Sequence, residues 1–238
     1  MLLQPSFFAP LIQYVALANS EKIVLEKQDN FQKQTYRNRC YIYGANGKQL
    51  LTVPILHAKS EIRQKTKDIR IDNSFGWQKN VIKSLEAGYR SSPFFEYYED
   101  DVCPVIEKKY EFLLDLNLAT MQIINESLRL DISYEFTDVY QLESSTNPKV
   151  LSGLSDSGLD DAVSVNGAKE QAKTNVYEQM DFRYLVNAKS PRQYDFKPYT
   201  QVFGSKHGYL SNLSILDLLF NEGTNAINYL QEHRSLLL

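Results

Sequence analysis

Hydrophobic positions at the start of the chain follow a strand pattern and then a helix pattern. Residues 1–4 form a short apolar run that ends at Pro5, which predicts a first strand. Apolar side chains over residues 8–16 recur at helical spacing, and Ser6 stands where it can cap that helix. The β-branched run over residues 23–25 predicts a second strand. This order indicates an α/β fold that opens with a strand–helix unit.

A β-hairpin is the clearest local prediction. Two strand-like runs, residues 39–44 and 49–55, flank the sequence Ala45-Asn46-Gly47-Lys48. The Asn-Gly pair favours a tight turn because both residues adopt the positive φ angles that such turns need. We therefore expect the two runs to pair in an antiparallel manner.

Helical periodicity dominates most of the remaining chain. It predicts a helix that begins near Trp77, one long or two short helices over 103–129, and a C-terminal helix over 209–230. Residues 67–72 and 132–137 have the character of strands. The whole pattern predicts an α/β protein in which a mixed sheet, with an N-terminal strand–helix unit and a hairpin, is flanked by helices.

The composition changes over residues 142–175, which are rich in Ser, Gly, Asn and Asp and contain no aromatic residue. Such a composition is typical of loops. We therefore expect a polar loop or lid at about 142–193, within a single domain that spans residues 1–238.

Composition and charge narrow the class of protein. Hydrophobic residues make up 43% of the chain and charged residues 23%, which is typical of a globular protein. The net charge of −3 argues against binding to nucleic acid or to an anionic membrane, and no apolar run reaches the length of a membrane span. Cys40 and Cys103 favour two reduced thiols in the cytoplasm. The histidines have no metal-ligand spacing, so we expect no metal site, and no motif indicates a cofactor.

The strongest candidate for ligand binding lies directly before the hairpin. It comprises Lys33, Tyr36, Arg37, Asn38 and Arg39. Arginine suits a two-pronged grip on phosphate or carboxylate, so this basic segment could hold an anionic small molecule. The alternative is a solvated edge strand that its charges protect from aggregation.

Further candidates lie at the ends of predicted elements. Gln4 ends the first strand where the chain turns into a helix, and ligand crevices in α/β sheets occur at such places. Asp217 stands at capping-box distance from Ser214; if buried, it could instead serve as a base. His207, in a polar turn, could transfer a proton or could simply be exposed. Gln201 could orient polar groups of a ligand.

Taken together, several stretches resemble the WbqC-like protein family. The residues that carry the resemblance are Gln4, Pro5, Phe8, Pro10 and Tyr14; Phe31, Lys33, Tyr36, Arg37, Asn38 and Arg39; Leu51, Thr52, Val53 and Pro54; Trp77, Lys79, Tyr89, Ser92, Pro93, Phe94 and Phe95; and Leu213, Ser214, Ile215, Asp217, Leu218, Leu219, Phe220, Asn221 and Gly223. The resemblance covers about residues 2–141 and 195–230. The ordered set is specific, although no single piece of it is.

The resemblance implies a bacterial protein of the kind encoded among O-antigen and surface-polysaccharide genes. One hypothesis is a cytosolic enzyme that transfers a group to or from a nucleotide-activated sugar, with Trp77 among the substrate-binding residues and Asp217 or His207 handling a proton. A second hypothesis is a non-catalytic binding or scaffold protein of the same pathway. RNA binding through the basic segment is a third, which the overall acidity disfavours. The oligomeric state is not indicated.

Overall fold

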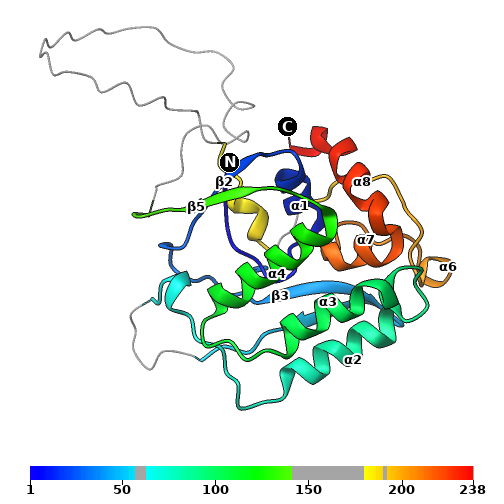
Figure 1. Ribbon diagram of the computed structural model, residues 1–238, viewed down its shortest axis with the longest axis horizontal. Helices are drawn as coiled ribbons and strands as arrows, with labels where there is room; N and C mark the ends of the chain where they lie inside the picture. Colours follow the sequence, from blue (N-terminus) through cyan, green and yellow to red (C-terminus); the bar gives the residue numbers. More distant parts are fainter. Residues whose placement is uncertain (57–62, 141–179, 190–191, 238) are drawn as a thin grey trace, which may run out of the picture.

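The computed structural model describes residues 1–56, 63–140, 180–189 and 192–237. Most of the segment predicted to be a loop or lid lies outside these residues. The described part is a mixed α/β structure with a small parallel sheet and an antiparallel hairpin, flanked by helices (Figure 1). This confirms the fold class that the sequence predicts.

The parallel sheet has three strands, in the spatial order β1 (Leu2–Leu3), β2 (Lys22–Leu25) and β5 (Ser133–Phe136). Leu2 lies opposite Val24, which in turn lies opposite Glu135. On the other side of β1, Leu2 forms a parallel bridge with Asp181. Because all these segments run in one direction, the residues that follow them collect at the same edge of the sheet.

Helix α1 (Leu11–Ala18) begins later than the sequence pattern predicts. Phe8 has a φ of 39°, in the left-handed region, and therefore interrupts a helix that would start earlier. Pro10 occupies the N-cap position. Ser6 does not cap the helix; its hydroxyl donates to Oε1 of Gln13 at 2.9 Å.

The predicted hairpin is formed by β3 (Arg39–Gly44) and β4 (Gly47–Thr52). Gly44 pairs with Gly47, which leaves Ala45 and Asn46 as a two-residue turn. Gly47 has a φ of 97°, a conformation that favours glycine. The Asn-Gly signal therefore places this turn correctly.

Three helices follow the hairpin: α2 (Trp77–Tyr89), α3 (Phe95–Glu107) and α4 (Leu113–Leu128). Helix α2 packs against β3 and α3, and α3 packs against α4 (Figure 1). The sequence left open one long helix or two short ones over 103–129; the structure has two helices there, and the first of them, α3, begins before residue 103. Residues 67–72 do not form a strand; a 3-10 turn at Thr66–Asp68 is followed by isolated bridges.

The C-terminal region is divided where the sequence predicts one helix. It contains α6 (Gly204–His207), α7 (Ile215–Glu222) and α8 (Ala226–Glu232), with 3-10 turns at Gly223–Asn225 and Arg234–Leu237. Gly223, with a φ of 55°, ends α7. The hydroxyl of Ser214 caps α7 by accepting from the amide of Leu216 at 3.4 Å.

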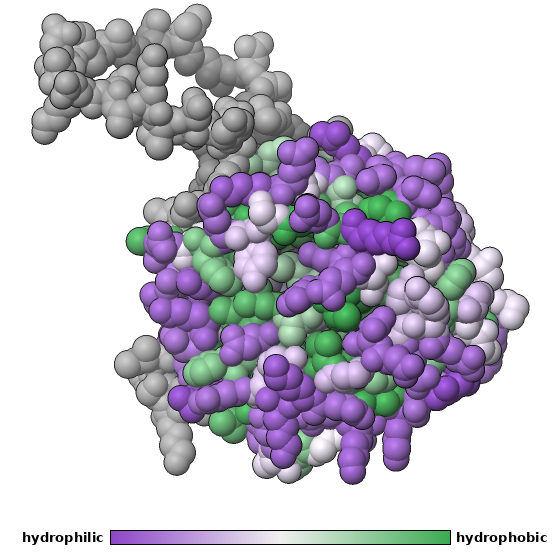
Figure 2. All heavy atoms as spheres, viewed as in Figure 1, coloured by the Kyte–Doolittle hydropathy of each residue, from purple (hydrophilic) through white to green (hydrophobic). Residues whose placement is uncertain are grey.

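Helix α1 is buried along almost its whole length and contacts both α7 and α8. In the view of Figure 2, hydrophilic side chains cover most of the surface, and hydrophobic ones show between them in smaller patches. Within the described residues, no helix combines the length and the apolar character needed to cross a membrane.

Candidate functional site

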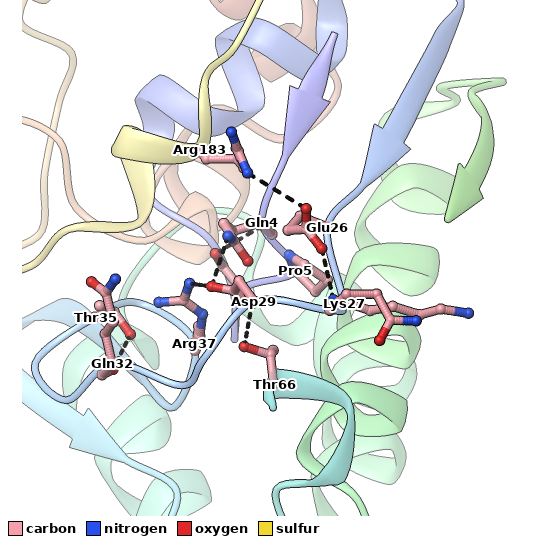
Figure 3. Close-up of polar contacts among 12 residues, drawn as sticks. Gln4, Pro5, Glu26, Lys27, Asp29, Gln32, Thr35, Arg37, Thr66 and Arg183 are labelled. Atoms are coloured by element: carbon pink, nitrogen blue, oxygen red, sulfur yellow. Dashed lines mark hydrogen bonds and ion pairs between the residues drawn. The ribbon is translucent and has the colours of Figure 1, made fainter. Parts of the chain in front are cut away.

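Polar side chains at the carboxyl edge of the parallel sheet are buried and bonded to one another (Figure 3). Gln4 follows β1, and Asp29 lies shortly after β2. Oδ2 of Asp29 accepts hydrogen bonds from Nε2 of Gln4 at 3.0 Å and from Nη2 of Arg37. Its Oδ1 accepts from the hydroxyl of Thr66 at 2.6 Å. Since the Arg37 and Asp29 side chains are only 2% and 6% exposed, they form a buried ion pair.

A second buried acid, Glu26, follows β2 directly. Its Oε1 accepts from the hydroxyl of Thr137 and from the amide of Gln28, both at 2.7 Å. Its Oε2 lies 3.5 Å from Nη1 of Arg183, whose Nη2 is 2.6 Å from Oδ2 of Asp181. Carboxylates and guanidinium groups therefore alternate along this edge. In the described chain, no three His, Cys, Asp or Glu side chains are grouped so as to hold a metal ion.

Two side chains at this edge retain buried polar atoms without a hydrogen-bond partner among the described residues. These atoms are Nε and Nη1 of Arg37 and Oε1 of Gln4. Burial lowers the pKa of Arg37, and the ion pair with Asp29 opposes that shift. Because arginine remains protonated in proteins, the unpaired donors are those of a buried cation. Buried polar atoms normally have a partner, so these atoms are candidates for contact with a bound water or a ligand.

A pocket of about 680 Å³ opens beside Asp29. Its lining includes three cationic side chains, Lys33, Arg63 and Lys65, all of them exposed. Nζ of Lys65 donates to Oε1 of Gln28 at 3.2 Å. None of the three cations forms an ion pair with an acidic residue in the described ranges. This pocket, called here the Asp29 pocket, therefore suits an anion.

A second hollow, of about 430 Å³, shares Lys33 and Phe31 with the Asp29 pocket. Asn38 and Arg39 also line it, next to Val53. Nδ2 of Asn38 donates to the carbonyl of Val53 at 3.0 Å, whereas its Oδ1 and Nε of Arg39 are buried without a partner in the described residues. The basic segment thus borders both hollows.

Asp217 belongs to a different network. Its Oδ1 accepts from the hydroxyl of Tyr89 at 2.8 Å, and its Oδ2 accepts from the hydroxyl of Tyr199 at 2.5 Å and from Nε2 of Gln201 at 2.7 Å. The Tyr89 hydroxyl in turn accepts from the amide of Tyr43 at 2.9 Å. Burial raises the pKa of Asp217, and its hydrogen bonds oppose that rise. These contacts tie α7 to α2 and β3.

The other candidates from the sequence lie apart from the sheet edge. His207 is exposed, with its Nε2 3.0 Å from the carbonyl oxygen of Ala45. Trp77 is buried in the core and makes an edge-to-face contact with Phe7. Tyr36 is buried and lines a third pocket.

The structure therefore brings the sequence candidates together in two groups. In the first group, Gln4 and Arg37 both bond to Asp29, and the neighbouring residues Lys33, Asn38 and Arg39 line the adjoining hollows. In the second group, Gln201 donates a hydrogen bond to Asp217. No described contact links the second group to Arg37.

Several residues of the site are not among those that the sequence predicts. Glu26 and Asp29 follow the second predicted strand much as Gln4 follows the first, so the rule that selected Gln4 could also have found them. Arg63 and Arg183 carry no comparable signal. They reach the site through chain folding alone.

The fold and site define an α/β protein whose parallel sheet bears a charged crevice at its carboxyl edge. The chain belongs to the WbqC-like protein family, whose model matches residues 4–229, and this confirms the resemblance found in the sequence. It is 25% identical over 217 residues to "Uncharacterized protein Rv1507c" of Mycobacterium tuberculosis (strain ATCC 25618 / H37Rv), with 90% of each chain covered. No solved structure matches the chain.

Proposed function

We propose that this protein binds a nucleotide-activated sugar with its phosphate groups in the Asp29 pocket, and that it acts in the cytoplasm as a group transferase of surface-polysaccharide synthesis. The observation that carries the proposal is the set of cations Lys33, Arg63 and Lys65. They line one pocket, and none is ion-paired with an acid of the described chain.

Size and position support this proposal. Pockets for small ligands usually measure roughly 300–1,000 Å³, and the Asp29 pocket falls within that range at about 680 Å³. The hollow beside Asn38 and Arg39 adjoins it and offers room for a second part of an extended ligand. The carboxyl edge of a parallel sheet is also where α/β proteins usually bind ligands.

The buried pair beneath the pocket supports the same assignment. Asp29 fixes Arg37, and Thr66 fixes Asp29, so the wall of the pocket is held before any ligand arrives. Preorganised groups of this kind lower the entropic cost of binding. The charges on the rim then supply attraction, while the ion pair supplies rigidity.

The second candidate function is binding without catalysis. It is favoured by the hydrogen bonding of Asp29 and Asp217, two buried acids that could otherwise act as bases. Donors from other side chains engage both carboxylate oxygens of each residue. Carboxylate oxygens engaged in this way are occupied by donors of the protein itself, which leaves little room for a substrate to present its proton to them. In this alternative, the same pocket holds the same ligand and releases it unchanged.

A thermal-shift panel of nucleotide sugars, free nucleotides and free sugars tests the binding proposal, because a ligand that binds only the folded state raises the melting temperature. We expect nucleotide sugars to stabilise the protein and free sugars to have no effect. No stabilisation by any nucleotide sugar would contradict the proposal.

Incubation of the protein with the stabilising nucleotide sugar, followed by chromatography, separates the two functions. Release of the nucleotide together with formation of the glycosylated acceptor supports transfer, whereas release without that product indicates hydrolysis by water. Unchanged ligand at an enzyme concentration that saturates binding supports the non-catalytic alternative and removes the assignment as a transferase.

A further inference from the structure

A third pocket shares no lining residue with the two hollows at the sheet edge. Its volume is about 430 Å³. Tyr36 lines it from the basic segment, Lys48 from β4, and Arg192 and Tyr194 from the segment before α6. We call it the Tyr36 pocket.

The Tyr36 pocket is cationic. Its lining residues include the cations Lys48 and Arg192 but no aspartate or glutamate. Neither cation forms an ion pair within the described residues. Each lies over an aromatic ring instead: Nζ of Lys48 is 4.2 Å from the centre of Tyr41, and the guanidinium carbon of Arg192 is 4.5 Å from the centre of Tyr184. These contacts hold the charges in place without neutralising them.

The hydroxyl of Tyr36 gives independent evidence that this pocket binds a ligand. The side chain is 2% exposed, and its hydroxyl has no hydrogen-bond partner in the described part of the chain. A buried hydroxyl normally finds a partner, so an unpaired one beside a pocket points to a ligand that supplies an acceptor. Burial raises the pKa of Tyr36, which keeps the proton on the hydroxyl and makes it a donor.

Both the backbone and the ring of Tyr36 are held by neighbouring residues. The amide of Tyr36 donates to the carbonyl of Val186 at 2.8 Å, and its own carbonyl accepts from the amide of Phe7 at 2.9 Å. Its ring meets the ring of Tyr41 edge to face, and that same Tyr41 ring lies under Lys48. The phenol donor and the ammonium group are therefore placed by one shared aromatic ring.

We propose that the Tyr36 pocket binds a small hydroxyl-bearing anion, whose phosphate or carboxylate group is held by Lys48 and Arg192 and accepts a hydrogen bond from the Tyr36 hydroxyl. The amide and hydroxyl side chains on the same wall, Gln193 and Ser211, suit the hydroxyl groups of such a molecule. This site is separate from the Asp29 pocket and does not depend on the function proposed above.

Titration calorimetry with three probes tests the proposal: glucose 1-phosphate, glucuronate and glucose. We expect at least one of the two anions to bind and glucose not to bind, and the anion that binds identifies phosphate or carboxylate as the recognised group. The Lys48→Gln/Arg192→Gln variant should lose about tenfold or more in affinity, because it removes both charge-assisted contacts. Tyr36→Phe should lose about threefold to tenfold, because it removes one hydrogen bond and keeps the ring.

The Lys33→Ala/Lys65→Ala variant is the matched control, since it removes two cations from the Asp29 pocket and leaves the Tyr36 pocket intact. Retained binding in this control supports the proposal. The proposal is overturned if neither anion binds, if glucose binds as tightly as the anions, or if binding is lost in this control and retained in Lys48→Gln/Arg192→Gln.

Discussion

Gln4 and Arg37 both donate hydrogen bonds to the same oxygen of Asp29. This shared acceptor fastens the basic segment before the hairpin to the end of the first strand. Lys33, four residues before Arg37, then lines the pocket beside Asp29. The bond from Arg37 to Asp29 therefore also brings Lys33, on the same short segment, to the rim of the pocket.

Breaking the Asp29–Arg37 pair should strongly destabilise the protein. Arg37→Met leaves a buried carboxylate without its cation, and such changes cost about 3–5 kcal/mol of unfolding free energy. The double variant Asp29→Asn/Arg37→Met should lose less than the sum of the two single variants, because the two residues are in contact. Urea denaturation measures all three.

Lys22→Met is the control for that series. Lys22 pairs with Glu135 at 2.7 Å, but the two side chains are 57% and 64% exposed. Exposed pairs contribute at most about 1 kcal/mol. If Arg37→Met lowers the unfolding free energy no more than Lys22→Met does, the buried pair does not stabilise the sheet edge.

Asp217 should make stability depend on pH in a defined direction. Burial raises its pKa above the ordinary value, so the folded protein keeps this proton at a pH where the unfolded chain has released it. Between those two pKa values, the unfolding free energy contributed by Asp217 falls as the pH rises. Asp217→Asn cannot titrate and should lack this component.

Urea denaturation of the wild type and of Asp217→Asn, from about pH 4 to about pH 7, tests this direction. Near the lower pH the variant should be less stable by about 1–3 kcal/mol, because its amide group faces the donors of Tyr199 or Tyr89. The difference in unfolding free energy between the wild type and the variant should become smaller as the pH rises. A difference that widens would show that the charged form is the one that the folded state prefers.

Gly223→Ala should destabilise the end of α7. Gly223 has a φ of 55°, and a Cβ atom there would lie 2.7 Å from ring carbons of Phe94. Strain and overpacking together should cost about 1–3 kcal/mol in denaturation experiments. Gly204→Ala is the control, because a Cβ atom there meets nothing within 4 Å. Equal effects of the two substitutions would contradict this explanation.

Local signals in the sequence predict much of the fold. The Asn-Gly pair places the hairpin turn, and helical periodicity places α2, because each signal depends on residues that are close in sequence. The predicted start of α1 is wrong because two features that delay it depend on tertiary contacts. These are the left-handed backbone conformation of Phe8 and the hydrogen bond from Ser6 to Gln13. Local spacing contains no information about either.

The site could be predicted only in part, for the same reason. Gln4 and Arg37 could be named from residue type and position, but their common partner Asp29 depends on strand order. Asp217 is buried, which is the condition under which the sequence made it a candidate base. Its partners Tyr89 and Tyr199 come from distant elements, and no spacing in the sequence indicates them.

The affinity for uridine diphosphate glucose, measured by titration calorimetry, tests the central claim most directly. Lys33→Ala/Lys65→Ala removes two exposed cations of the Asp29 pocket, and Lys79→Ala/Lys83→Ala removes two exposed cations of α2, so the two variants carry the same net charge. We predict about a tenfold or greater loss of affinity in the first variant and wild-type affinity in the second. Equal affinities in both variants would contradict the claim that the Asp29 pocket holds the phosphate groups.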